Sequence, residues 1–141
     1  TLFPYTTLFR SAMGFSAFLR EVSGLPEADG FLKDGRTLAA CMEGLTLPGC
    51  CDGRTCAALD GWRVLHTPGH TRGSVCLYNE SEKLLISGDT LFYMSWGRTD
   101  LPGGSEREIR QSLKRLTHQC APDTRVYPGH DSYGWLLGEM L

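Results

Sequence analysis

The sequence predicts a mixed α/β (α+β) fold, and two observations support this prediction. Short apolar or alternating segments typical of strands are interleaved with segments typical of amphipathic helices. Three of the strand segments end in Pro-Gly or Gly-Asp, pairs that turn the chain sharply. We therefore expect a sheet with helices packed against it and tight turns at the strand ends.

The composition of the 141 residues is that of an ordinary globular protein and indicates one domain or part of one. Apolar residues make up 41% and charged residues 21%, which supports one core and disfavours disorder. The 14 basic and 16 acidic residues leave a net charge of -2, so no nucleic-acid partner is expected. The apolar runs are too short to span a bilayer, so no membrane partner is expected either.

The N-terminal residues 1–11 are interpreted as non-native, adapter-derived sequence. They read like one frame of a common sequencing adapter, and the chain does not begin with Met. They do not have the pattern of a secretory signal, because Arg10 follows the apolar residues instead of preceding them. Residues 12–141 are then expected to be the C-terminal portion of a domain.

Two regions precede the central strands. The spacing of apolar residues predicts a short amphipathic helix over residues 14–22. The turn-rich stretch that follows contains short strand candidates at 37–39 and 45–47. Residues 34–40 are echoed by residues 52–58, which suggests two similar turn-then-strand units.

The remaining strands follow in close succession. We expect strands at 62–66, 74–78, 84–87 and 125–127, and the polar residues between the second and third predict an antiparallel hairpin. The last residues, 135–141, are expected to begin a helix.

The clearest helix is expected over residues 106–118. Ser105 and Glu108 match a capping box, in which each side chain hydrogen-bonds the backbone N–H of the other residue. Ile109 and Leu116 lie on one face of the expected helix.

Three expected strands end in a turn that carries a side chain able to bind metal, namely His70, Asp89 and His130. Proline keeps the preceding residue extended, and glycine permits the sharp turn that follows. Each residue alone is more often a surface histidine or a turn aspartate. The repetition of strand, turn and ligand favours a site for zinc or a similar ion.

Three other polar residues near these turns have simpler interpretations. His66 is expected at a strand end and His118 at the solvated end of a helix. Asp131 either hydrogen-bonds the neighbouring histidine in support of a metal or is simply a turn residue.

The six cysteines include no Cys-x-x-Cys pair, which disfavours a zinc knuckle or a thioredoxin-type centre. We expect reduced thiols in a cytoplasmic protein, with Cys76 as a small core residue. The alternative is a disulfide among Cys41, Cys50, Cys51 and Cys56.

Four motifs give the chain a specific resemblance. They are Thr-Pro-Gly-His-Thr at 67–71, Ser-Gly-Asp-Thr-Leu-Phe at 87–92, Gly-Arg-Thr-Asp-Leu-Pro-Gly-Gly at 97–104 and Tyr-Pro-Gly-His at 127–130. In this order they resemble the metallo-β-lactamase superfamily, and within it the glyoxalase II-like (hydroxyacylglutathione hydrolase-like) hydrolases. The resemblance implies part of an αββα sandwich that lacks much of the first sheet.

The resemblance also implies roles for individual residues. His70 corresponds to a ligand of one metal, Asp89 to the carboxylate that bridges both metals at the catalytic centre, and His130 to a ligand of the second metal. Arg98 corresponds to the basic residue that contacts the substrate. The intact parent is expected to hold two zinc ions, with iron or manganese as alternatives, and to hydrolyse thioesters or related small esters.

The sequence departs from the family pattern in two ways. The family's His-x-His-x-Asp-His motif does not occur in it, so this chain is expected to be an inactive fragment of an active parent. Asp100 replaces an aromatic residue that helps to bind glutathione. Two alternatives stay open: a persulfide dioxygenase-like enzyme with one iron, which shares the Gly-Arg-Thr-Asp string, and a non-catalytic module on the same scaffold.

Overall fold

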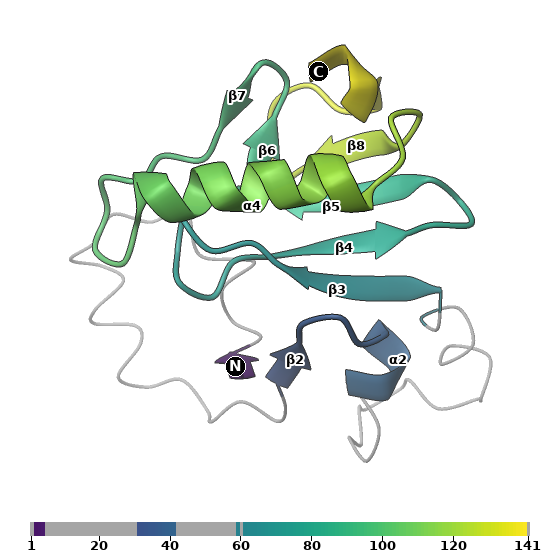
Figure 1. Ribbon diagram of the computed structural model, residues 1–141, viewed down its shortest axis with the longest axis horizontal. Coiled ribbons are helices and arrows are strands. Elements are labelled where there is room, and N and C mark those ends of the chain that lie inside the picture. The colour runs from purple at the N-terminus through teal and green to yellow at the C-terminus, as the bar shows by residue number, and fades with distance from the viewer. Residues whose placement is uncertain (1, 5–30, 42–58, 60, 141) are drawn as a thin grey trace.

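A five-stranded sheet forms the centre of the computed structural model, which describes residues 2–4, 31–41, 59 and 61–140. The strand order is β3-β4-β5-β8-β9 (Figure 1). The strands are β3 (Trp62–His66), β4 (Val75–Asn79), β5 (Leu84–Gly88), β8 (Arg125–Pro128) and β9 (Trp135–Leu136). Four of the expected strands, including the antiparallel β4–β5 hairpin, are thereby confirmed.

Smaller elements surround this sheet. Two short antiparallel pairs are β1 (Leu2–Pro4) with β2 (Phe31–Lys33), and β6 (Leu91–Phe92) with β7 (Ser95–Trp96). The helices are α2 (Leu38–Cys41), α4 (Glu106–Gln119) and the 3-10 helix η2 (Leu137–Met140). No helix among the described residues is long and apolar enough to cross a membrane.

Strand direction brings three strand ends to one edge of the sheet. β3 and β5 are both antiparallel to β4, so they run in the same direction. β5 is parallel to β8, so β8 shares that direction. The carboxyl ends of β3, β5 and β8 therefore lie at the same edge, and each leads into one of the turns with an expected metal ligand.

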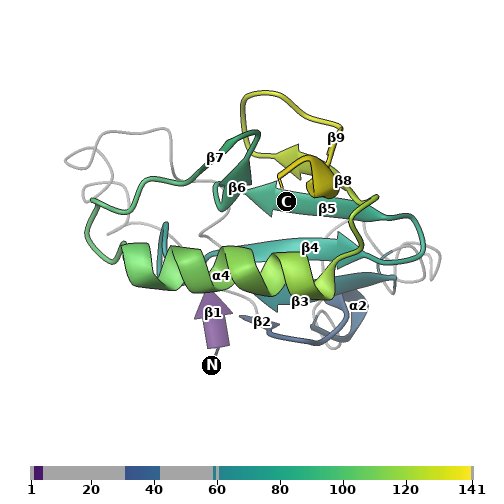
Figure 2. The same cartoon turned by 45° about the horizontal axis from the view of Figure 1, so that its top comes forward.

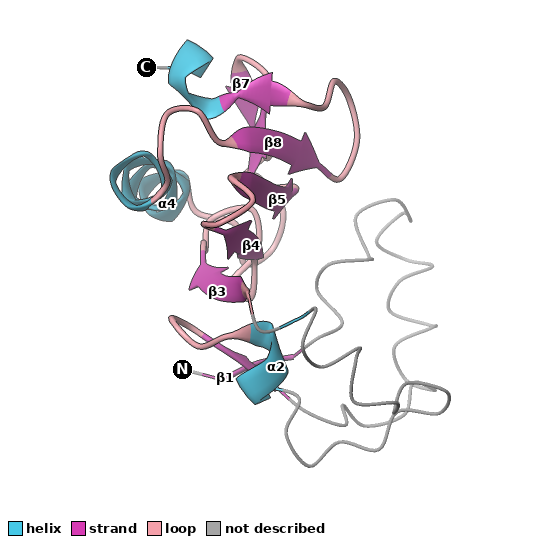
Figure 3. Cartoon of the chain, turned by 90° about the vertical axis from the view of Figure 1, so that its right-hand side faces the viewer, coloured by secondary structure: helices cyan, strands magenta, loops and turns pink. Residues whose placement is uncertain are grey.

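The helix α4 covers one face of the sheet, as Figures 2 and 3 show from two directions. Ser105 caps it by accepting a hydrogen bond from the backbone N–H of Glu108, which confirms one half of the expected capping box. Ile109 and Leu116 are fully buried on its inner face. The core beneath it includes Cys76, Tyr78, Leu85, Val126 and Leu137.

The first ligand turn packs tightly against α4. Gly69 has a φ of +137°, a backbone conformation that side chains rarely adopt. A Cβ atom there would lie 2.3 Å from the backbone nitrogen of Ile109. Only glycine fits, and the contact sets the position of the turn that carries His70.

The opposite face carries an apolar row across four strands. Val64, Leu77, Ile86 and Tyr127 are cross-strand partners in register. Val64 is buried with Leu32 near β2, whereas Ile86 on the central strand is 39% exposed. The sheet is therefore apolar on both faces, and among the described residues only one end of this row is well covered.

Two expected elements differ from the structure. Residues 37–39 were expected as a strand, but α2 begins at Leu38 because the Thr37 hydroxyl accepts a hydrogen bond from the backbone N–H of Ala40. The helix expected at 135–141 is instead β9 followed by η2. Trp135 pairs with Val126 and is 8% exposed, so burial of the indole in the core favours a strand there.

Several expectations concern residues outside the described ranges. These are the helix at 14–22, the strand at 45–47, the second copy of the repeat and the cysteines at 50, 51 and 56. Cys41, Cys76 and Cys120 are free thiols, and Cys76 is buried as expected.

Hydrogen bonds among Asp34, His66 and Arg115 link β3 to α4 and to the turn after β2. The Asp34 carboxylate accepts hydrogen bonds from the backbone N–H of His66 at 2.8 Å and from the Arg115 guanidinium at 2.9 Å. Arg115 also donates to the backbone carbonyl of His66 at 3.0 Å. Burial raises the pKa of Asp34, but these hydrogen bonds and the positive charge of Arg115 outweigh it and lower the pKa.

This cluster predicts a pH-dependent contribution to stability. A carboxyl group with a lowered pKa in the folded state stabilises the fold above its unfolded pKa, and the contribution is lost as the pH falls through the folded pKa. The difference in urea unfolding midpoint between the wild type and Asp34→Asn should be constant above about pH 5 and shrink below about pH 4. A difference that does not change with pH would contradict this assignment.

Candidate metal centre

The three expected ligands meet at the common edge of β3, β5 and β8. The Nε2 atom of His70 lies 3.7 Å from Oδ2 of Asp89. The Nε2 atom of His130 lies 3.6 Å from Oδ1, the other oxygen of the same carboxylate. One carboxylate therefore stands between two imidazoles and faces each with a different oxygen.

Hydrogen bonding orients the His70 ring. Its Nδ1 lies 2.8 Å from the backbone carbonyl oxygen of Arg98, so Nδ1 carries the hydrogen and donates it. In the neutral ring the lone pair of Nε2 then faces a carboxylate oxygen. The Nε2 lone pair and the carboxylate oxygen repel each other unless a cation lies between them. The His70 side chain is only 10% exposed.

His130 is held in a similar way from the opposite side. Its Nδ1 donates to the Asp131 carboxylate at 2.9 Å, which leaves Nε2 directed toward Asp89. Phe92 stacks on the ring with centroids 4.3 Å apart. Asp131 has a φ of 68°, so it is a turn residue and also the hydrogen-bond partner of a ligand candidate. Carboxylates often orient metal-binding histidines in this way.

The spacing of these atoms fits a metal better than a direct contact. Distances of 3.6 and 3.7 Å exceed those of a good hydrogen bond. Zinc bonded to nitrogen and oxygen at about 2.0–2.2 Å in tetrahedral geometry holds these atoms about 3.4 Å apart. Each gap offers one nitrogen and one oxygen, and within the described ranges no three His, Cys, Asp or Glu side chains form a complete metal-binding group. The arrangement is therefore two half-sites that share Asp89.

Two glycines allow the backbone to pack around the carboxylate. A Cβ atom on Gly129 would lie 2.7 Å from Oδ1 of Asp89. A Cβ atom on Gly97 would lie 1.9 Å from the backbone oxygen of Asp89 and 3.0 Å from Cβ of His70. Sequence reasoning assigned no role to Gly97 or to the carbonyl of Arg98, because their contacts with His70 span 27 and 28 residues of chain.

The side chain of Arg98 is engaged by a neighbour. Asp100 binds it through both carboxylate oxygens, at 2.7 Å to Nε and 2.6 Å to Nη2. These hydrogen bonds lower the pKa of Asp100 to about 2 and raise the pKa of Arg98, so the pair stays ionised at neutral pH. Both side chains are more than 60% exposed, so the pair contributes little to stability.

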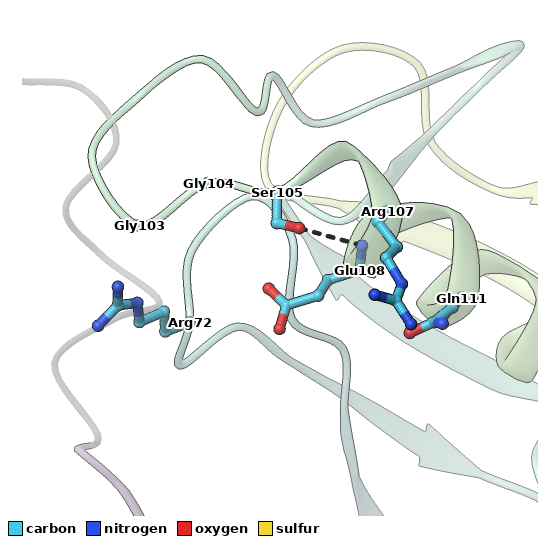
Figure 4. Close-up of a pocket in the computed structure, with 7 residues that line it drawn as sticks. All are labelled: Arg72, Gly103, Gly104, Ser105, Arg107, Glu108 and Gln111. Atoms are coloured by element: carbon cyan, nitrogen blue, oxygen red, sulfur yellow. Dashed lines mark hydrogen bonds between the residues drawn. The ribbon is translucent and has the colours of Figure 1, made fainter.

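One surface pocket of the described residues lies close to the turn that carries His70. Its volume is about 510 Å³, and it borders the start of α4 (Figure 4). Arg72, two residues after His70, lines it, but none of the three ligand candidates does. Its other lining residues are Gly103, Gly104, Ser105, Arg107, Glu108 and Gln111. Since it brings together no group of nitrogen or carboxylate ligands, we place the metal chemistry at Asp89.

The other two histidines are engaged elsewhere. His66 ends β3, and its Nε2 lies 2.9 Å from the backbone oxygen of Arg72. His118 is exposed, as expected, and its Nδ1 lies 2.7 Å from the carbonyl of Lys114 in the same helix.

Comparison with known proteins identifies the family. The sequence profile of the Metallo-beta-lactamase superfamily matches residues 57–130, more than half of the chain. The chain belongs to the metallo-β-lactamase superfamily. The matched range includes all three ligand candidates and the strands that lead to them.

Individual proteins are also similar in sequence to part of this chain. An uncharacterized protein of Aquifex aeolicus is 52% identical over 69 residues, 49% of this chain and 33% of that protein. A probable metallo-hydrolase of Methanocaldococcus jannaschii is 40% identical over 77 residues, 52% of this chain and 36% of its own length. The probable polyketide biosynthesis zinc-dependent hydrolase PksB of Bacillus subtilis is 42% identical over 80 residues, 56% of this chain and 34% of its own. The matches thus span about a third of each relative.

Solved structures of the metallo-β-lactamase superfamily share the fold. TTHA1623 in a di-iron-bound form aligns with a TM-score of 0.53 and 48% identity over 57% of this chain and 39% of its own. BLEG-1 B3 metallo-beta-lactamase aligns with a TM-score of 0.52 and 40% identity over 55% of this chain and 37% of its own. The described residues thus form part of a metallo-β-lactamase fold, as expected from the sequence.

The contacts of the two glycines predict different effects of alanine. Gly129→Ala should displace the Asp89 carboxylate, which can move, and weaken zinc binding about tenfold or more while costing about 1 kcal/mol of stability. Gly97→Ala meets backbone and should disrupt both binding and folding. Zinc titrations followed by the NMR ring signals of His70 and His130, with thermal melts, distinguish these outcomes. Unchanged zinc binding in Gly129→Ala would contradict the geometry.

Proposed function

We propose that this chain carries half of the catalytic centre of a metal-dependent hydrolase. His70 and His130 would each supply one metal ligand, and the Asp89 carboxylate would supply one oxygen to each metal. The observation that carries this proposal is the Asp89 carboxylate, which presents its two oxygens to two oriented imidazoles. The names of the relatives, a probable metallo-hydrolase and a probable zinc-dependent hydrolase, support the same reaction class.

The donor set suits zinc, with iron and manganese as alternatives. Metal ions bound in such a centre lower the pKa of water and polarise the carbonyl under attack. The residues of this chain hold the ligand geometry: the Arg98 carbonyl fixes the His70 ring, and Asp131 fixes the His130 ring. Because Nδ1 of each ring donates a hydrogen bond, Nε2 is the nitrogen that faces Asp89 and that would bind a metal.

We further propose that the reaction is glyoxalase II-like hydrolysis of thioesters or related small esters in the cytoplasm. The motif around Arg98 supports this subtype. The active protein is proposed to be longer than this chain, which is then an inactive fragment. This is supported by the two-ligand half-sites and by matches that span about a third of each relative.

One experiment tests the reaction and the fragment proposal together. Metal content and hydrolysis of a hydroxyacylglutathione and of a small neutral thioester are measured for this chain and for the longer product of its source locus. The longer product should bind two metals and hydrolyse a thioester, and Asp89→Asn should abolish both properties while His118→Ala leaves them unchanged. Tight binding of two metals and turnover by this chain alone would overturn the fragment proposal.

The same measurement decides the main alternative. The Gly97–Asp100 string is shared with persulfide dioxygenases that use one iron. A longer product that binds one iron and consumes oxygen with glutathione persulfide would establish that alternative. A longer product with neither metal nor activity would establish a non-catalytic module.

The Arg98–Asp100 pair predicts how the enzyme selects substrates. A substrate carboxylate that binds Arg98 meets the negative charge of Asp100, which already occupies Nε and Nη2 of the guanidinium. In the longer product, Asp100→Ala should therefore lower KM for a glutathione thioester several-fold and leave KM for a neutral thioester unchanged. Equal changes for both substrates would argue against a role in selection.

A further inference from the structure

A buried hydrogen bond joins two of the turns that carry metal ligands. Thr67 lies three residues before His70, and Thr90 directly follows Asp89. The two hydroxyl oxygens are 3.0 Å apart, and the residues are 0% and 1% exposed. The bond thus lies in the interior, close in the chain to His70 and Asp89, where water does not compete with it.

The backbone hydrogen bonds of the sheet do not join the two strands that lead to these turns. The strands that lead to these two turns are β3 and β5, and β4 lies between them. Strands two places apart in a sheet are separated by about 10 Å. By contrast, the third turn is linked directly to the second, because the backbone N–H of Gly129 donates to the carbonyl of Gly88 at 2.9 Å.

A cysteine completes the network at the end of the intervening strand. Cys76 lies on β4, with its sulfur 3.4 Å from the Thr67 hydroxyl, and its thiol donates to the carbonyl of Ser87 at 3.6 Å. Burial raises the pKa of Cys76 to about 11, so the thiol stays neutral. The network therefore spans β3, β4 and β5 without introducing a charge beside the carboxylate of Asp89.

We propose that Thr67 and Thr90 are positioning residues that set the distance from His70 to Asp89. This inference rests on the proposed metal-dependent function and adds a pair of residues that do not touch the metal. A rigid link beneath the turns keeps the His70 nitrogen and the carboxylate oxygen at the spacing that a metal requires. It acts together with the packing of Gly69 against Ile109 and with the Arg98 carbonyl, which hold the same turn and the His70 ring.

The test uses variants that keep side-chain shape. Thr67→Val and Thr90→Val remove one hydroxyl each, and the double variant removes both. Thr67→Ser keeps the hydroxyl and serves as the rescue. Thr124→Val is the matched control, because Thr124 is fully buried and its hydroxyl is the one buried side-chain polar atom of the described residues without a partner.

Two readouts separate positioning from plain stability. Each single valine variant removes one hydrogen-bond partner from the remaining threonine hydroxyl, so its unfolding midpoint should be lower than that of the wild type. The double variant leaves neither hydroxyl in place, so its unfolding midpoint should return most of the way to the wild-type value. Zinc affinity, from titrations of the folded protein, should nevertheless fall about tenfold or more in both single variants and in the double variant. It should stay near wild type in Thr67→Ser and Thr124→Val. Recovery of zinc affinity together with stability in the double variant would overturn the proposal.

A second readout needs no metal. Nitrogen-15 NMR of the His70 ring should show the Nδ1–H form in the wild type and loss of that single form in the valine variants. An unchanged ring spectrum in the double variant would also overturn the proposal. If the longer product binds no metal but the ring spectra change as expected, the proposed function fails while the positioning role stands.

Discussion

The common direction of β3, β5 and β8 is the constraint on which the candidate metal centre depends. Because two antiparallel pairings separate β3 from β5 and a parallel pairing joins β5 to β8, all three strands end at one edge. If any one of these strands ran in the opposite direction, its turn would lie at the opposite edge of the sheet. Buried apolar side chains on both faces hold this pairing in register, so the core determines where the ligands meet.

Electrostatics at this edge explains why the arrangement indicates a metal. A carboxylate that faces the lone pairs of two neutral imidazoles is unfavourable without positive charge nearby. The Arg98 side chain is paired with Asp100, and Arg98 contributes its backbone carbonyl to His70. The structure therefore brings two imidazole nitrogens to the two oxygens of the Asp89 carboxylate.

Local sequence patterns predicted β3, β4, β5, β8 and α4 correctly, whereas the short strands β1, β2, β6 and β7 were not expected. The alternation in residues 62–66 and the cap at Ser105 both correspond to observed elements, because short-range hydrogen bonds and apolar periodicity suffice there. One of the two errors occurs where long-range packing decides, and the other where a local helix cap does. Trp135 lies in a segment of helical character, yet it pairs with Val126 and fills the core under α4. Thr37 caps a helix in a segment that was expected to be a strand.

The sequence by itself determined the ligand types, the turns that carry them and the family resemblance, because each is encoded within a few consecutive residues. Only the tertiary structure decided that His70 and His130 face different oxygens of Asp89, and that the Arg98 carbonyl orients one ring. It also decided that Thr67 contacts Thr90 across the end of an intervening strand. These contacts join residues 19 to 41 positions apart in the chain, and strand pairing and core packing bring such residues together.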